Sequence, residues 1–319
     1  MSGDVTIIGG GNAARDADEL LTRAGFPLRH AFELEPGDRN PIILGEAPNA
    51  FAVARQAVDQ GRHLLVAAPQ NFTPERLAYL VQARKKNQAV SIWSERRFHP
   101  GYHFVGGLIE ADEAWRPRYL RMQTLSMETT THALADWLTL ESIALVIGLA
   151  GQAPLSVAAN QKQNATRTAP DLLDLTVDFG GIEVFLQVGL GEALERRETL
   201  LAGTDRKALV DELNQNTPIR IVEDVPDSSS AARWLSCKAP TPEELARQQV
   251  LSFLDATIKQ DLAQAEGDVW LRSLAAIEAM ERSLVENGIA SPVLIREEGQ
   301  RFRVVPGRGL PTTSPPSVA

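Results

Sequence analysis

The stretch Val5-Thr6-Ile7-Ile8-Gly9-Gly10-Gly11-Asn12-Ala13-Ala14 decides the fold of this chain. Four β-branched residues are followed directly by Gly-x-Gly-x-x-Ala, and a helical pattern then runs from Arg15 to Ala24, before Gly25. A strand, a glycine turn and a helix in this order form the fingerprint of a dinucleotide-binding βα unit. The sequence therefore predicts a Rossmann-like domain at the start of the chain.

The small residues of this turn each have a physical role. Gly9 permits the tight turn, and Gly11 lets the backbone approach a pyrophosphate because it has no Cβ. Ala14 is small enough for the helix to pack closely on the strand. The helix N-terminus presents N–H groups and a partial positive charge to phosphates. We therefore predict that Gly9, Gly11, Asn12, Ala13 and Ala14 bind NAD or NADP.

Composition excludes several classes of partner. The chain has 319 residues, enough for two domains, and 44% hydrophobic residues, which is ordinary for a globular protein. Its net charge of −9 argues against nucleic acid or an anionic membrane surface as a partner. A single cysteine, Cys237, fits a reducing compartment, and we see neither a secretory leader nor a membrane span. We therefore expect a cytoplasmic protein whose partner is a small molecule.

Strands and helices alternate through the first third of the chain. The predicted strands are Leu28–Leu34, Pro41–Gly45, His63–Ala67 and Val90–Trp93, with helices at Asn49–Gln60 and from Thr73 to about Asn87. This alternation predicts a parallel, doubly wound sheet. Glu35 follows the second strand, about 20 positions after the glycines, where an acidic residue commonly binds the adenosine ribose. An exposed acid in a turn explains Glu35 equally well.

The pattern changes after Trp115, because several strands then follow one another between helices. We predict α/β plus α+β: a shortened Rossmann-like parallel sheet at residues 1–117, and a domain of largely antiparallel open sheet and helices at residues 118–303. Residues 304–319 are rich in Pro, Ser and Thr and predict a disordered tail. Phe179-Gly180-Gly181-Ile182 predicts a hairpin turn in the second domain.

Taken together, several stretches resemble the Gfo/Idh/MocA oxidoreductase family over nearly the whole chain. They are Ile7–Gly11, Ala54–Pro69, Arg96–Tyr102, Leu201–Asp205 and Leu274–Gly288. The resemblance implies binding of NAD(P) and oxidation or reduction of sugars, inositols or related carbonyl compounds. It also implies a further helix and strand between Glu35 and Pro41, which wall the adenine side of the cofactor pocket and which this chain lacks.

The family's Glu-Lys-Pro signature supplies a lysine beside the nicotinamide. The matching tripeptide here is Ala67-Ala68-Pro69. The resemblance places Pro69 at the cofactor, but the lysine position is Ala68, and a methyl group cannot donate a proton. General acid–base help worth about two to four orders of magnitude in rate would then be missing.

The family's second signature, Asp-x-Gly-x-His-x-x-Asp, supplies further candidates. The matching positions are Trp137, Thr139, Glu141 and Ala144, so that Glu141 replaces the histidine. His132 and Asp136 lie nearby and are four residues apart, which places them on one helix face. They have either a surface or capping role or form the acid–base pair. The candidate catalytic residues are therefore Glu141, His132 and Asp136.

Other side chains near the predicted sheet edge are candidates for binding a metal ion or an anionic ligand. His99 and His103 share the four-residue spacing of a helix face, but zinc needs three or four ligands, so we predict no metal site. Arg97 either contacts an anionic group of a ligand or forms a salt bridge between domains.

Three functions remain open on the sequence. The chain is an NAD(P)-linked oxidoreductase in which another group replaced the lysine, a pseudoenzyme that senses a ligand or partners an active homologue, or a non-redox enzyme using the same pocket. Apolar residues alternate from Leu173 to Val188, so that one face of this hairpin can cover helices and the other a second subunit. We therefore expect a homodimer or homotetramer formed through the C-terminal sheet.

Overall fold

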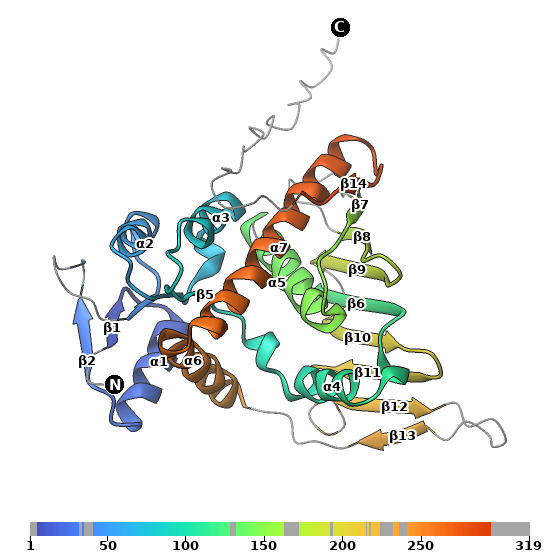
Figure 1. Cartoon of the computed structure of the whole chain (residues 1–319), viewed down its shortest axis with the longest axis horizontal. Coiled ribbons are helices and arrows are strands. Elements are labelled where there is room, and N and C mark those ends of the chain that lie inside the picture. Colours follow the sequence, from blue (N-terminus) through green and yellow to red (C-terminus); the bar gives the residue numbers. More distant parts are fainter. Residues whose placement is uncertain are drawn as a thin grey trace, which may run out of the picture.

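The computed structural model describes residues 5–31, 34, 41–127, 132–162, 172–191, 194–214, 216, 218–223, 232–235 and 241–294. Two β-sheets lie side by side in it, and helices from the C-terminal part of the chain pass between them (Figure 1). The smaller sheet comes from the start of the chain, and the larger one is formed by strands from Tyr119 onward.

The first sheet is entirely parallel and has the strand order β2-β1-β3-β4-β5. Its strands β1, β3, β4 and β5 are short, continuous runs buried along their whole length, as expected for strands covered on both faces. The strands are β1 (Val5–Ile8), β2 (Leu28–Ala31), β3 (Ile42–Leu44), β4 (Leu64–Val66) and β5 (Val90–Ile92). The helices between them are α1 (Asn12–Arg23), α2 (Ala50–Asp59) and α3 (Pro74–Gln82).

The first sheet is shorter than the common doubly wound arrangement. That arrangement has a further strand outside the position of β2, whereas here β3 pairs directly with the other side of β1. Residues 32–41 separate β2 from β3, and a parallel crossover with a helix needs a dozen or more residues. The predicted shortened sheet is therefore confirmed. Glu35 lies outside the described residues.

The second sheet has nine strands in the order β13-β12-β11-β10-β6-β9-β8-β7-β14. Each neighbouring pair is antiparallel except β6 and β9, so the predicted, largely antiparallel sheet is confirmed. Its strands are β6 (Tyr119–Ser126), β7 (Ser156–Lys162), β8 (Leu172–Asp178), β9 (Glu183–Leu190), β10 (Arg196–Ala202), β11 (Arg206–Asp211), β12 (Ile219–Glu223), β13 (Ala232–Leu235) and β14 (Ser291–Pro292).

The hairpin predicted at Phe179-Gly180-Gly181-Ile182 joins β8 to β9. Gly180 and Gly181 have φ angles of 71° and 112°, which explains why glycine is needed at both positions. Gly203-Thr204-Asp205, at the end of the stretch Leu201–Asp205, joins β10 to β11.

The remaining helices pack on one face of the second sheet or against the first sheet and its helices. They are α4 (Pro100–Ala111), α5 (His132–Ala150), α6 (Pro242–Ile258) and α7 (Gln260–Val285), with short 3-10 turns η1 (Pro69–Asn71), η2 (Glu95–Phe98) and η3 (Glu113–Trp115). The helix α7 contacts both sheets. The helix α6 packs its apolar residues against α1 and β1, so the polypeptide returns to its starting sheet after completing the second one.

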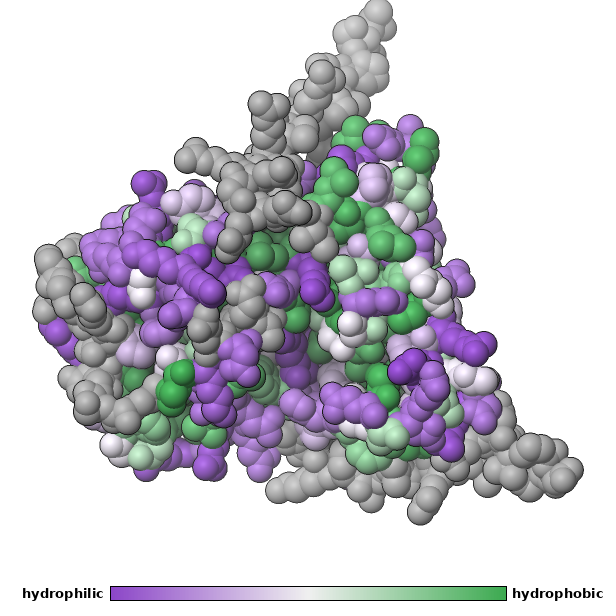
Figure 2. Space-filling model, viewed as in Figure 1, coloured by the Kyte–Doolittle hydropathy of each residue, from purple (hydrophilic) through white to green (hydrophobic). Residues whose placement is uncertain are grey.

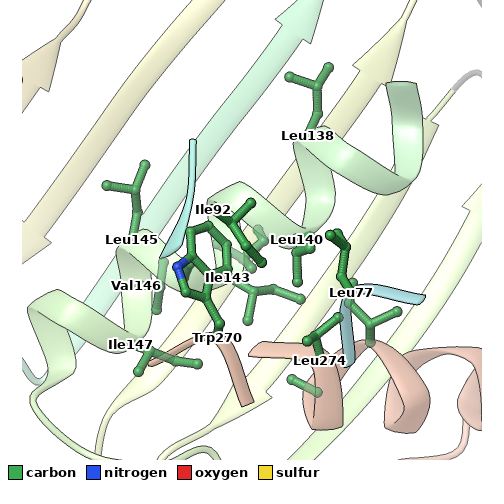
Figure 3. Packing of buried hydrophobic residues seen from close by; sticks show 14 of the residues in the cluster. Leu77, Ile92, Leu138, Leu140, Ile143, Leu145, Val146, Ile147, Trp270 and Leu274 are labelled. Atoms are coloured by element: carbon green, nitrogen blue, oxygen red, sulfur yellow. The ribbon is translucent and has the colours of Figure 1, made fainter. Parts of the chain in front are cut away.

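The helices α5 and α7 form the apolar centre between the two sheets. Trp270 of α7 is fully buried and stacks on Trp137 of α5, with 6.1 Å between ring centroids. Figure 3 shows Trp270 beside Ile92 of β5 and among the apolar side chains of α5. This packing fixes α5 relative to the carboxyl end of the first sheet.

The surface carries both polar and apolar regions. In Figure 2, hydrophilic residues cover much of the area over α2 and α3, and hydrophobic residues gather near the end of α7 and around β14. The exposed apolar residues of that end include Leu155, Val285, Ile289 and Leu294. Among the helices that the structure describes, none has both the length and the apolar character that crossing a membrane requires.

Candidate functional site

A cleft of about 320 Å³ lies between the two sheets, at the carboxyl ends of the first sheet's strands. Open α/β sheets bind their ligands in this position. The first sheet contributes the turns that follow β1, β3, β4 and β5, and the part of the chain that follows the first sheet contributes α5 and β10. The lining residues are Gly10, Gly11, Asn12, Glu46, Ala67, Ala68, Pro69, Trp93, Ser94, Arg96, Trp137, Leu138, Glu141 and Arg197.

A second hollow of about 240 Å³ adjoins the cleft, because Leu138 and Arg197 line both. It lies along the end of β6, where Thr124 to Met127 form its wall. The cleft therefore continues from the glycine turn of the first sheet toward the second sheet, as a site for a cofactor and a small ligand requires.

The glycine turn after β1 has the backbone that phosphate binding needs. Gly9 and Gly11 have φ angles of 86° and 88°, and Ala14 is buried against the sheet. The helix α1 begins at Asn12 with no side-chain cap and no acidic residue in its first turn. Its N-terminal N–H groups are therefore available to an anion from the cleft.

One side chain at this turn does not fit a dinucleotide. Glu46 follows β3, and a Cβ on Gly11 would lie only 2.9 Å from the Glu46 Cδ and Cγ atoms. The Glu46 side chain thus occupies the space that the missing Cβ leaves open. The backbone of the turn suits a pyrophosphate, whereas the carboxylate of Glu46 repels one.

The turn after β4 forms the next part of the wall. Ala67 and Ala68 are 3% and 4% exposed, and Pro69 begins η1. Ala68, at the position where the family resemblance implies a lysine, therefore presents only a methyl group. The described lining residues include two arginines, Arg96 and Arg197, and no lysine.

Glu141 lies on α5 and faces the turn after β5. The Ser94 hydroxyl donates a hydrogen bond to Glu141 Oε1 over 2.7 Å, and Arg96 Nη1 lies 3.6 Å from Glu141 Oε2. Burial raises the pKa of Glu141, and the nearby charge of Glu212 adds to this, although Arg96 and Ser94 act in the opposite direction. Glu141 is therefore a carboxyl group in the cleft wall that holds its proton more tightly than an ordinary glutamate.

A second buried glutamate shares the same arginine. Arg96 donates two hydrogen bonds to Glu212, from Nε over 2.9 Å and from Nη2 over 2.8 Å, and the Tyr102 hydroxyl donates a third over 2.5 Å. Burial alone would raise the pKa of Glu212, but the charge of Arg96 and these hydrogen bonds lower it below the ordinary value. Arg96 thus neutralises mainly Glu212, and Glu141 is the carboxyl of the pair that takes up a proton.

The raised pKa of Glu141 gives a prediction for stability against pH. The unfolded chain titrates near the ordinary value of 4.5, and the folded chain titrates higher. The carboxylate therefore costs stability as the pH rises through the folded pKa, and it costs nothing well below 4.5. Glutamine keeps an acceptor for Ser94 and has no charge. We expect Glu141→Gln to gain stability over the wild type as the pH rises from about 4 to 8, in urea unfolding.

The control for this experiment is Glu110→Gln, which removes an exposed carboxylate on α4 outside the cleft. Its stability relative to the wild type should change little over the same pH range. A stability difference for Glu141→Gln that shrinks with rising pH would contradict a raised pKa at this site.

The structure brings some of the predicted site residues together and leaves others undecided. Gly11, Asn12, Pro69 and Glu141 line one cleft. Gly9 lies beside it in the same turn, and Ala13 and Ala14 lie in the first turn of α1. His132 and Asp136 lie in the first turns of α5, but their side chains are outside the described residues, as is Glu35. Their assigned roles stay predictions.

Arg97 and His99, which the sequence suggested as candidates for binding, contact other parts of the protein. The Arg97 guanidinium lies 5.3 Å from the ring centroid of Trp270, above its face, in a cation–π contact. His99 caps α4, since its Nδ1 accepts a hydrogen bond from the Gly101 N–H, and burial lowers its pKa. Within the described ranges, no group of three or more His, Cys, Asp or Glu side chains is arranged to hold a metal ion.

Sequence reasoning missed the buried network around Glu141. Ser94, Arg96, Tyr102 and Glu212 are not neighbours of Glu141 along the chain, and Arg96 and Glu212 are 116 positions apart. The Arg96-Arg97 pair after the last strand was a signal, but it was interpreted through Arg97. Glu46 gave no signal either, because its contact with the glycine turn crosses from β3 to β1.

Solved structures with a similar fold are numerous, and the three described below are 12%, 16% and 20% identical to this chain. UDP-N-acetylglucosamine 3-dehydrogenase GnnA from Acidithiobacillus ferrooxidans is 20% identical, with 88% of this chain and 97% of that chain covered and a TM-score of 0.68. This chain therefore has the same fold as that dehydrogenase. Levoglucosan dehydrogenase, solved with NADH, is 12% identical, with 92% of this chain and all 100% of that chain covered and a TM-score of 0.69.

A further structure with this fold is that of GenD2 from gentamicin A biosynthesis, solved with NAD. It is 16% identical, covers 92% of this chain and 96% of that chain, and has a TM-score of 0.67. No protein-family model matches the sequence, and no curated protein matches it. The similarity to these structures therefore establishes the fold of this chain, whereas the chemistry of this chain depends on the residues that line its cleft.

Proposed function

We propose that this chain is a divergent member of the Gfo/Idh/MocA oxidoreductases that binds a small sugar-like or carbonyl ligand, with NAD or NADP, and whose ordinary dehydrogenase chemistry is impaired. The observation that carries the proposal is Ala68, a buried methyl group in the cleft wall where the family resemblance implies a lysine. The similar structures support the class, since two of them hold NAD or NADH.

The remaining chemistry of the cleft favours slow proton transfer. When bound, a nicotinamide cofactor supplies hydride transfer itself, and the protein provides position and charge. The described wall holds two carboxyl groups, Glu46 and Glu141. Glu141 is the one whose pKa is raised by burial, and Ser94 orients it. Glu141 therefore supports residual acid–base function in place of the missing lysine.

The absence of a lysine at Ala68 also supports an alternative function, that of a pseudoenzyme. In this alternative the cleft binds a ligand as a sensor, or the chain serves as the partner subunit of an active homologue, with no turnover. The cofactor then has a structural role or no role. Measurements of turnover and of ligand binding distinguish the two proposals, because a sensor binds its ligand without converting it.

A thermal-shift assay with NAD, NADH, NADP and NADPH tests the cofactor part of the proposal. A ligand present at a hundred times its Kd stabilises the folded state by about 2.7 kcal/mol, which raises the melting temperature measurably. We expect a shift with at least one nucleotide when millimolar concentrations are used, because the backbone of the glycine turn fits a phosphate.

Two glycine variants provide matched controls for that assay. Gly10 lines the cleft and has open space around an added Cβ, so Gly10→Asp adds a charge there and should abolish the shift. Gly107 on α4 also has open space and does not line the cleft, so Gly107→Asp should keep it. If no nucleotide shifts the wild type or a variant without the charge of Glu46, the cofactor part of the proposal is wrong.

We also propose that the chain forms a homodimer or homotetramer through the open face of its nine-stranded sheet. The alternating apolar residues of the β8–β9 hairpin, such as Leu175 and Leu186, face the covering helices. The opposite face carries a hydrogen-bonded row of Gln123, Gln187 and Asp174 side chains, each partly exposed. Light scattering on a dilution series tests this, and a monomer at every concentration would overturn it.

A further inference from the structure

We propose that Glu46 controls the affinity of the glycine turn for phosphate, so that this cleft disfavours a dinucleotide until the Glu46 charge is removed. The inference rests on the proposed cofactor site and names a residue that sets its selectivity. It follows from where the backbone holds Glu46, what its side chain occupies, and which charges surround it.

The backbone of Glu46 is fastened to the glycine turn. Gly10 N–H donates to the Glu46 carbonyl over 2.9 Å, and Glu46 N–H donates to the Gly10 carbonyl over 2.8 Å. The neighbouring glycine allows this approach, because a Cβ on Gly45 would lie 2.1 Å from the Gly10 oxygen and 2.6 Å from the Ala14 Cβ. Glu46 therefore has a fixed starting point directly beside the turn.

The side chain of Glu46 then lies over Gly11. A Cβ on Gly11 would lie 2.9 Å from both Cγ and Cδ of Glu46 and 3.0 Å from its Oε1. In a dinucleotide site, the missing Cβ of this glycine is what lets a pyrophosphate reach the backbone. In this chain the same space holds a carboxylate, and a phosphate must displace it or lie against it.

The charges around the turn explain why Glu46 stays there. The first turn of α1 has no acidic residue and its N-terminus has no side-chain cap, so the partial positive charge of the helix attracts the Glu46 carboxylate. Both arginines of the cleft wall already have carboxylate partners. Arg96 pairs with Glu212 and Glu141, and Arg197 lies 3.0 Å from Glu195. Arg15, on the first turn of α1, donates a hydrogen bond to Asn12 Oδ1 over 2.8 Å, but its side chain is exposed, so solvent and salt screen its charge. An incoming phosphate therefore meets the negative charge of Glu46 with only a screened cation beside it.

Titration of NADH and NADPH into the full-length wild type and Glu46→Gln, followed by calorimetry at low ionic strength, tests the inference. Glutamine keeps the size of the side chain and removes its charge. We expect the Kd of the variant to fall by about tenfold, which corresponds to about 1.4 kcal/mol. Because Glu46 is exposed, added salt should reduce this difference. Glu110→Gln makes the same charge change on α4 and should leave the Kd unchanged.

Each outcome bears on a different statement. If the wild type and Glu46→Gln bind NADH or NADPH equally tightly, Glu46 does not control the affinity of the glycine turn. The proposed cofactor site would then remain supported. Equal gains in Glu46→Gln and Glu110→Gln would also overturn it, because net charge would then explain the effect. No binding by either protein would overturn this inference together with the cofactor part of the proposed function.

Discussion

Replacing Arg96 by methionine is expected to lower the free energy of unfolding by about 3–5 kcal/mol at neutral pH. The Arg96 and Glu212 side chains are each 6% exposed and share two short hydrogen bonds. Methionine keeps most of the apolar stem but leaves the Glu212 carboxylate, and the Glu141 carboxyl beside it, without their cation. Urea unfolding followed by tryptophan fluorescence measures the loss.

Two further variants make this result specific. Arg116→Met removes an arginine that is 71% exposed and forms a surface ion pair with Glu113, so the change should stay within about 0.5 kcal/mol. Adding Glu212→Gln to Arg96→Met removes the stranded charge and should recover part of the lost stability. If Arg96→Met costs no more than Arg116→Met, the buried network does not hold the two halves of the site together.

Replacing Ala68 by lysine is expected to raise NAD(P)-linked turnover of a sugar or carbonyl compound by about two to four orders of magnitude. Ala68 lies in the wall of the same cleft as Glu141, and the cleft has room for a longer side chain. A lysine there supplies a proton donor and a positive charge beside the reacting oxygen. Absorbance of NADH or NADPH at saturating nucleotide measures the rate.

Ala68→Met is the matched control, because methionine has a similar length and no charge or proton to give. It should remain as slow as the wild type. Wild-type turnover of about 1–1000 per second would contradict the impaired chemistry that we propose. Equal rates for the lysine and methionine variants, with nucleotide bound to both, would favour the sensor over the enzyme.

Local sequence was sufficient to predict much of the fold. The run Val5–Ile8 and the glycines after it predict a strand, a turn and a helix, because their geometry depends on neighbours in the chain. The Gly180-Gly181 hairpin was predictable for the same reason, since both φ angles require glycine. Boundaries were less certain: α3 ends at Gln82 although the predicted helix continued to Asn87.

The candidate site was predictable only in part, because its polar contacts join distant segments. The family resemblance in the sequence placed Glu141 and Pro69 at the site, and both line the cleft. No local pattern indicates that Glu212, at the end of β11, pairs with Arg96 after β5. The position of Glu46 over Gly11 depends on how β3 lies beside β1, which is a property of the folded sheet.

The helix α7 has a consequence for how a ligand enters. One continuous helix of 26 residues, about 39 Å long, packs on both sheets, and Trp270 near its middle stacks on Trp137. A hinge motion between the sheets would have to bend this rod or separate the two indole rings. We therefore expect the cleft to keep the same shape with and without a ligand, so that a preformed site selects the ligands that fit it.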